Sequence, residues 1–144
     1  MKAANSIKVG VAAFLLGGFL TAGAQVASAV DGQVSSYSTF GYSYQNYSSM
    51  QNTSANAVAS TTVRNANSGN TPGGYMGVNA RIFTSGGTEK GESGFKYTNG
   101  PSSAFSVPYL YGPSGTYYSY GVTRAYNGNG YNSYYTFKSP NLNH

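Results

Sequence analysis

The sequence predicts an all-β protein: a single antiparallel β-sandwich of about seven short strands, preceded by an N-terminal signal peptide. Beyond residue 30, no segment has the apolar spacing of an amphipathic helix. Short segments with alternating apolar and polar residues recur every ~8–12 residues and are separated by glycine-rich turns. Tyrosine replaces leucine and isoleucine as the main source of apolar surface, because all 15 tyrosines follow residue 36 and the chain has no Trp and no Cys.

Residues 1–29 have the features of a secretory signal peptide. Two lysines provide a positive start, and the apolar stretch 9–20 is shorter than the ~20 residues of a membrane-spanning helix. Ala27-Ser28-Ala29 matches the small-residue cleavage pattern, and Ala22-Gly23-Ala24 is a second, weaker match. We therefore expect one secreted domain, residues 30–144, with no transmembrane segment in the mature chain.

The first part of this domain, residues 34–64, is predicted to form two strands. Tyrosine alternates with serine in the first strand, and the second becomes β-branched over residues 57–63. A polar connection near residues 48–56 is expected to join them. Residues 65–74, rich in Asn and Gly, predict a turn.

Residues 75–83 form the clearest predicted strand. Its apolar face comprises Met76, Val78, Ala80 and Ile82. Its opposite face comprises Gly77, Asn79 and Arg81. This pattern predicts one buried face and one solvated face. A turn at residues 85–88 is expected to return the chain along residues 89–98.

Asn99-Gly100 predicts a tight turn, because both residues tolerate positive φ. The next predicted strand covers residues 104–111, with Phe105, Val107 and Tyr109 on one face. Pro108 removes a backbone donor there, which predicts an edge strand or a bulge.

Two further strands are predicted at residues 116–126 and 131–138, after glycine-rich turns. The first has an alternating face composed of Tyr118, Tyr120, Val122, Arg124 and Tyr126. No clean internal repeat links these strands, which argues against a propeller or solenoid.

Charge and composition exclude several classes of partner. Six basic residues follow the leader, scattered singly along the sequence: Arg64, Arg81, Lys90, Lys96, Arg124 and Lys138. Three acidic residues accompany them: Asp31, Glu89 and Glu92. Because no Lys/Arg cluster is present in the sequence, nucleic acid is not an expected partner. Without cysteine, neither disulfides nor a lipid-modified cysteine can form.

The titratable residues predict a protein that is not an enzyme. Outside the leader, His, Asp and Glu number four, and His144 and Asp31 lie near the ends of the mature chain. Glu89 and Glu92 flank Lys90 in a predicted turn, where paired carboxylates would be poorly held for glycoside hydrolysis. We predict no catalytic residue, no metal ligand and no cofactor.

Surface recognition by tyrosine is the alternative that remains. The candidate residues are Tyr117, Tyr118, Tyr120, Tyr131, Tyr134 and Tyr135, whose rings could stack on sugars. Adjacent residues of a strand point to opposite faces, so about half of these rings should be buried. Cross-strand tyrosine ladders that only stabilise the sheet explain the same pattern. The composition of residues 36–50 also predicts self-association through edge strands.

Four segments carry a resemblance to a known group of proteins. They are Tyr44-Gln45-Asn46-Tyr47, Thr62-Val63-Arg64-Asn65, Val78-Asn79-Ala80-Arg81 and Tyr134-Tyr135-Thr136-Phe137. With them, the chain resembles small secreted β-sandwich proteins of Gram-positive bacteria, which include bacteriocins of the lactococcin kind. The resemblance implies action at the cell envelope without an active site, and it assigns no functional residue.

Taken with the composition, the resemblance predicts a secreted, non-enzymatic β-domain that acts by surface contact at the bacterial cell envelope in a bacteriocin-like way. The partner would be a cell-wall or extracellular polysaccharide, or another envelope component. The alternative function is a carbohydrate- or matrix-binding structural module that self-associates.

Overall fold

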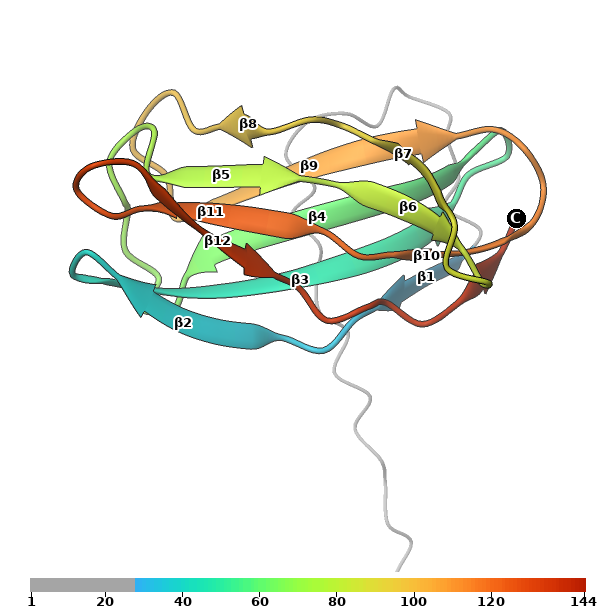
Figure 1. The fold of residues 1–144 in the computed structure, drawn as a ribbon, viewed down its shortest axis with the longest axis horizontal. Coiled ribbons are helices and arrows are strands. Elements are labelled where there is room, and N and C mark those ends of the chain that lie inside the picture. The colour runs from blue at the N-terminus through green and yellow to red at the C-terminus, as the bar shows by residue number, and fades with distance from the viewer. Residues whose placement is uncertain (1–27) are drawn as a thin grey trace, which may run out of the picture.

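The computed structural model describes residues 28–144, all of whose regular elements are β-strands (Figure 1). The all-β prediction is confirmed, and every strand pairing is antiparallel. The predicted signal peptide lies outside the described residues except for Ser28 and Ala29, which begin the first strand.

Thirteen strands form three sheets within residues 28–144. One sheet has the order β1-β3-β4-β9, with β2 also paired to β3, and contains β1 (Ser28–Asp31), β2 (Ser35–Thr39), β3 (Tyr42–Asn52), β4 (Ala57–Asn65) and β9 (Ala104–Tyr111). A second has the order β13 (Leu142–Asn143), β10 (Thr116–Ser119), β6 (Arg81–Thr84) and β7 (Glu89–Glu92). The third has the order β12 (Tyr131–Tyr135), β11 (Val122–Tyr126), β5 (Met76–Asn79) and β8 (Lys96–Tyr97).

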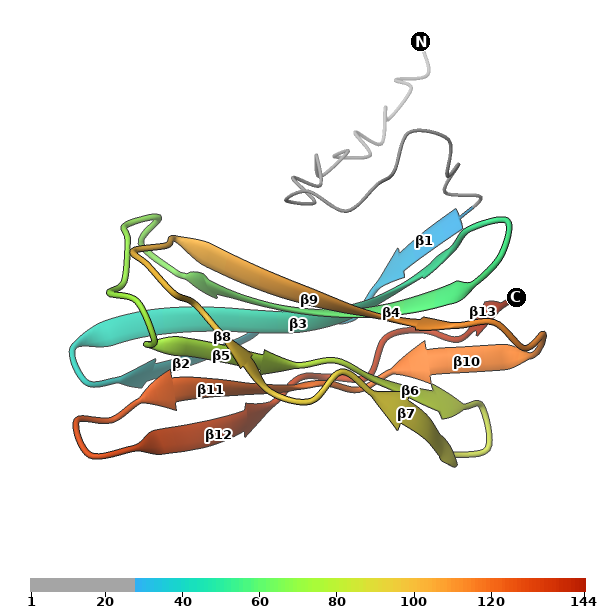
Figure 2. The same cartoon turned by 90° about the horizontal axis from the view of Figure 1, so that it is seen from above.

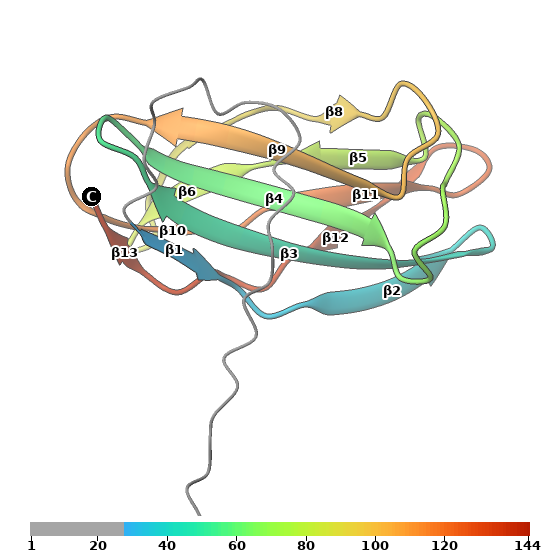
Figure 3. The ribbon, with the colours of Figure 1, turned by 180° about the vertical axis from the view of Figure 1, so that it is seen from behind.

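The two smaller sheets lie end to end and face the five-stranded sheet, as Figure 2 shows. The chain runs from β5 into β6 through Ala80, and from β10 into β11 through Tyr120 and Gly121. We call the five-stranded sheet the first layer and the two smaller sheets the second layer. Viewed from behind, β3, β4 and β9 of the first layer cover the second (Figure 3).

The core between the layers consists of two apolar clusters. One contains Tyr44, Val63, Met76, Val78, Val107 and Ala125. The other contains Met50, Ala57, Ala59, Ile82 and Tyr117. The predicted apolar face of residues 75–83 is confirmed, because its four apolar side chains are fully buried. Tyrosines contribute to both clusters, as the shortage of leucine and isoleucine requires.

A buried set of hydroxyl groups separates the two clusters along the strands. The Ser48 Oγ lies 2.7 Å from Thr136 Oγ1 and 3.3 Å from Thr61 Oγ1. The Gly121 backbone N–H donates to Ser48 Oγ at 3.0 Å and to Thr136 Oγ1 at 3.1 Å. We call these hydroxyls of Ser48, Thr61 and Thr136 the hydroxyl belt. It satisfies the backbone where the second layer is interrupted at Gly121.

The prediction for residues 34–64 is wrong in two details. The segment holds three strands, because Phe40 and Gly41 form a tight turn with φ of 48° and 80°. Phe disfavours positive φ, so Gly41 is the only turn signal that the sequence gives there. Residues 48–52 continue β3 instead of forming a connection, because the belt pairs the Ser48 hydroxyl inside the core.

The expected solvated face of residues 75–83 is also largely covered. Asn79 is 5% exposed, and its amide donates to Glu92 Oε2 at 2.5 Å. Gly77 lies beneath the Tyr97 ring, which a Cβ atom at residue 77 would meet at 2.5 Å. Both partners come from residues 89–98, which run along the edge of β5 and β6 as β7 and β8.

Asn99-Gly100 does not close a hairpin. It lies in the connection from β8 in the second layer to β9 in the first, and neither residue has a positive φ. The edge position predicted for residues 104–111 is confirmed, because β9 ends its sheet and pairs with β4 alone. Thirteen strands replace the expected seven or so because several predicted strands are divided, and because β1, β2 and β13 were not expected.

Candidate recognition surface

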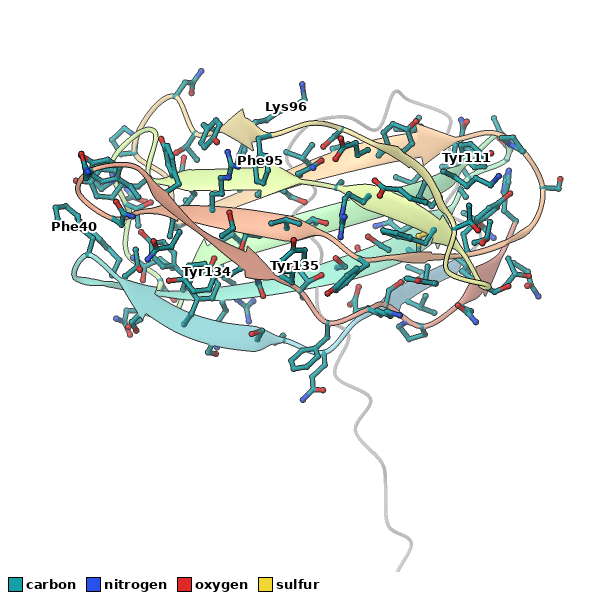
Figure 4. The ribbon with its side chains drawn as sticks, in the orientation of Figure 1. Phe40, Phe95, Lys96, Tyr111, Tyr134 and Tyr135 are labelled. Atoms are coloured by element: carbon teal, nitrogen blue, oxygen red, sulfur yellow. The ribbon has the colours of Figure 1, made fainter. Side chains whose placement is uncertain are left out.

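The side of the second layer that faces away from the first carries a group of aromatic rings, of which Tyr131 and Tyr135 are the most exposed. In β10 and β11, inward and outward side chains alternate. The inward set includes Tyr117 and Ala125, which belong to the core clusters. The outward set is the predicted face of Tyr118, Tyr120, Val122, Arg124 and Tyr126. Figure 4 views this layer from outside, with Tyr135 on β12 and Phe95 near β8 labelled.

We call this side the outer aromatic face. Its rings are Phe83, Phe95, Tyr97, Tyr118, Tyr120, Tyr126, Tyr131 and Tyr135. Its cations are Arg81, Arg124 and Lys138, each placed over at least one of these rings. Cross-strand register brings them together, because Arg124 is opposite Ser133, and Val122 is opposite Tyr135.

Arg81 holds the rings at the middle of the face. Its guanidinium carbon lies 5.0 Å from the centre of the Phe83 ring, 5.2 Å from Tyr120 and 5.7 Å from Tyr135. Its Nε donates to the Tyr120 carbonyl at 2.9 Å, and its Nη1 lies 3.8 Å from Glu89 Oε2. Tyr120 and Tyr135 stack with their centres 5.6 Å apart. Arg81 is therefore committed to partners within the chain.

Lys138 covers the neighbouring rings. Its Nζ lies 5.0 Å from the centre of Tyr118 and 5.9 Å from that of Tyr120. Tyr118 in turn stacks on Phe83, with ring centres 5.3 Å apart. Lys138 itself is exposed, so its ammonium group is available to solvent and to a ligand.

Arg124 organises the other end of the face. Its guanidinium carbon lies 3.8 Å from the centre of Phe95, and its Nη1 donates to the Tyr97 hydroxyl at 2.8 Å. Its Nε donates to Ser133 Oγ at 3.3 Å. Tyr97 packs against Tyr131 at 4.9 Å between centres. Cation–π contact and hydrogen bonds thus fix the guanidinium among rings.

The six tyrosines proposed from the sequence divide between core and surface. Tyr117 is 4% exposed and donates to the carbonyls of Pro113 and Ser114, so it is not a surface residue. Tyr118 is 7% exposed, because Phe83 and Lys138 cover it. Tyr134 is half-buried and stacks on Tyr37 at 3.7 Å, between β12 and β2. These placements correct the expected surface position of Tyr117 and Tyr118.

The remaining three candidates, Tyr120, Tyr131 and Tyr135, lie on the outer aromatic face and, unlike Tyr118, are accessible there. Tyr131 is 40% and Tyr135 57% exposed, and Tyr120 is half-buried between Arg81 and Tyr135. The Tyr131 hydroxyl donates to the Gly74 carbonyl at 2.7 Å, which fixes its ring. Partial burial has the larger effect, and the nearby phenols of Tyr97 and Tyr126 the smaller, in raising the pKa of Tyr131 above its usual value.

The sequence did not single out Arg81, Arg124 or Lys138 as site residues, or either phenylalanine of the face. The three cations are far apart in the sequence, and the pairing of the strands brings them to one face. The usable signal was the period of two, since Arg124 shares its face with Tyr120 and Tyr126. Phe95 shares that period with Tyr97, on which it stacks. Phe83 gave no such signal, because its ring partners Tyr118 and Tyr120 are distant in sequence.

The carboxylates considered for catalysis have other partners here. Glu89 pairs with Arg81, and Glu92 accepts from the Asn79 amide. Within residues 28–144, no group of three His, Cys, Asp or Glu residues is placed to hold a metal ion. Nor does the described part of the chain include a helix that is long and apolar enough to cross a membrane.

Comparison with known proteins yields no match: no family model fits the chain, and no curated protein or solved structure is significantly similar to it.

Proposed function

We propose that residues 30–144 form a secreted, non-enzymatic β-sandwich that acts by surface contact at the bacterial cell envelope, as a bacteriocin-like factor. The observation that carries this proposal is the outer aromatic face, where eight rings and three cations are gathered on one layer. Concentrated aromatic and cationic side chains are typical of surfaces that bind partners.

The way in which the face is held supports a binding role. The rings of Tyr120 and Tyr135 are stacked on each other and held by Arg81, and the Tyr131 ring is fixed by its hydroxyl. A surface whose side chains are already ordered loses little conformational entropy on binding. Contact through such a surface requires no chemical step.

A carbohydrate- or matrix-binding module is the second candidate. It is favoured by the polar groups between the exposed rings of β12, where Asn132 and Ser133 separate Tyr131 from Tyr134 and Tyr135. Rings with neighbouring amides and hydroxyls suit stacking and hydrogen bonding to sugars. Under this alternative, the protein would coat a polysaccharide without harming cells.

The test uses purified residues 30–144 with live bacteria, isolated envelopes and insoluble polysaccharides. We expect sedimentation with isolated envelopes and inhibition of growth, both weakened in the Tyr135→Ser variant. Leu110→Ser is the matched control, since Leu110 is 55% exposed on β9 in the first layer. Polysaccharide retention without growth inhibition would favour the second candidate. If the protein bound neither envelopes nor polysaccharide, both functions would be refuted.

A further inference from the structure

We propose that the outer aromatic face binds an acidic polysaccharide, a polymer of uronic acid residues lying along β10 and β11. The inference rests on the proposed action at the envelope and names the ligand class for that surface. The face joins two elements that such a polymer needs: rings that stack on sugars, and cations without a carboxylate partner.

Arg124 carries a charge that no carboxylate of the described residues neutralises. A guanidinium has five N–H donors, and Arg124 uses one toward Tyr97 and one toward Ser133. The ion pair within residues 28–144 is that of Arg81 with Glu89, so Arg124 has no carboxylate partner among the described residues. Because Arg124 is half-buried beside Phe95, its attraction for an anion is screened less than that of a fully exposed charge.

Rings and charges are spaced along the outer aromatic face. Tyr118, Tyr120, Val122, Arg124 and Tyr126 occupy successive outward positions along β10, β11 and the connection between them. Arg124 follows Tyr120 by four residues, a separation of about 14 Å if this part of the chain is extended. Lys138, over the Tyr120 ring, is the second cation without a carboxylate partner among the described residues. Tyr135, opposite Val122, is an exposed ring between the two cations. A linear polymer could therefore meet a cation, a ring and a second cation in turn.

This order favours a polyuronate over other anionic polymers. A glycerol phosphate polymer has charge but no ring to stack on Tyr135 or Tyr131. Single-stranded nucleic acid has both, but its binding sites use a continuous basic groove along the backbone. Here two unpaired cations are separated by about four strand residues. A guanidinium can meet two oxygens of a carboxylate or of a phosphate alike, so the sugar rings and the separation of the charges are what favour a polyuronate.

The test measures binding of purified residues 30–144 to polygalacturonate and to the same polymer with its carboxyl groups methyl-esterified. Esterification keeps the sugar rings and removes the charge. We expect the charged polymer to bind at least tenfold more tightly, the loss expected for a missing charge-assisted hydrogen bond, and to bind more weakly as salt rises. Equal binding of both polymers would overturn the inference.

Variants locate the site. Arg124→Gln is expected to weaken polygalacturonate binding about tenfold, whereas Arg64→Gln should leave it unchanged. Arg64 is the matched control, because it lies over the Tyr47 ring at 5.9 Å and donates to Gln45, but on β4 of the first layer. A melting curve shows that each variant is folded. Equal losses in both variants would refute this site.

Other polymers separate this inference from the proposed function. Binding to envelopes without binding to polygalacturonate would overturn the acidic polysaccharide and leave envelope contact standing. Loss of both would refute both. Binding to poly(glycerol phosphate) or to single-stranded DNA as tightly as to polygalacturonate would show recognition of charge alone, contrary to the inference.

Discussion

Tyr44 shows at the scale of one residue how this protein uses tyrosine. The side chain is fully buried in the core, where its ring packs against Tyr37 and Tyr42. Its hydroxyl has no hydrogen-bond partner among the described residues. The ring therefore contributes apolar burial while the hydroxyl costs free energy.

Tyr44→Phe is accordingly expected to raise the free energy of unfolding by about 1 kcal/mol, as measured by urea denaturation. Tyr117→Phe is the matched control. Tyr117 is also buried in the core, but its hydroxyl donates to two carbonyls, so the control should lose about 1 kcal/mol. A loss of stability in Tyr44→Phe would contradict the assignment of an unpaired hydroxyl.

The same burial predicts how stability depends on pH. Burial, and secondarily the phenols of Tyr42, Tyr75 and Tyr134, raises the pKa of Tyr44 to about 12 from 10.0. Burial also raises the pKa of Tyr37. Since the unfolded chain ionises first, the stabilisation is complete below pH 10 and is lost as pH rises toward the folded pKa. Denaturation midpoints between pH 9 and 12 should fall, and they should fall less in Tyr44→Phe.

At the scale of elements, the junction between β10 and β11 depends on Gly121. A Cβ atom there would lie 1.9 Å from the Thr61 Oγ1 and 2.5 Å from its Cγ2. Thr61 is fully buried in the facing layer, so it has no room to move away. The absence of a side chain lets the second layer approach the hydroxyl belt.

Gly121→Ala is therefore expected to lower the free energy of unfolding by about 3 kcal/mol, near the upper end of overpacking costs. Gly130→Ala is the control, because no atom lies within 4 Å of its Cβ position and its φ is not positive. The control should change stability by less than about 0.5 kcal/mol. Similar stabilities for the two variants would argue against the close approach of the layers.

The first strand gives a further test at this scale. β1 pairs with β3 from Ser28 opposite Asn52 to Asp31 opposite Ser49. Cleavage after Ala29 would remove half of this strand, whereas cleavage after Ala24 would keep it. A purified chain that begins at residue 25 should melt at a higher temperature than one that begins at Val30, because it keeps more strand pairing. Equal melting temperatures would show that this pairing adds no stability.

Strands were predictable from sequence where one face is apolar, and poorly predictable where it is polar. The alternation of Met76, Val78, Ala80 and Ile82 located a buried face correctly. Residues 48–52 were wrongly predicted to be a connection. Ser48 is buried because its hydroxyl pairs with those of Thr61 and Thr136, which are 13 and 88 residues away. The Phe40 turn escaped notice because contacts with Tyr75 and Tyr126 support the ring in an unfavourable backbone conformation.

The candidate surface was predictable only in part, for a related reason. The period of two correctly placed Tyr118 and Tyr120 on one face. It did not predict that Tyr118 is buried beneath Lys138. The cations were invisible as a group because Arg81, Arg124 and Lys138 come from separate strands and connections. Only their register in the sheet makes them neighbours.

At the scale of the whole molecule, charge is divided unequally between the layers. Arg64 and Asp31 belong to strands of the first layer. The second layer has Arg81, Lys90, Lys96 and Arg124 in its strands, Lys138 over its rings, and Glu89 and Glu92. The net positive charge is therefore concentrated on the side that carries the outer aromatic face.

We expect this asymmetry to orient the protein on negatively charged supports. Lys138→Gln should elute from a cation exchanger at lower salt than Arg64→Gln, although both variants lose one charge. Identical elution would indicate that the two layers contribute equally to adsorption.

The hydroxyl belt helps to fix the register in which the strands pair. Strands made of Tyr, Ser, Asn and Thr at alternate positions could slide past one another by two residues and keep the same faces inward. Such a slide would place Met50 or Asn46, in place of Ser48, against Thr61 and Thr136, and would leave buried hydroxyls without partners. The hydroxyl groups of Ser48, Thr61 and Thr136 thus favour a single strand register in a sequence of low complexity.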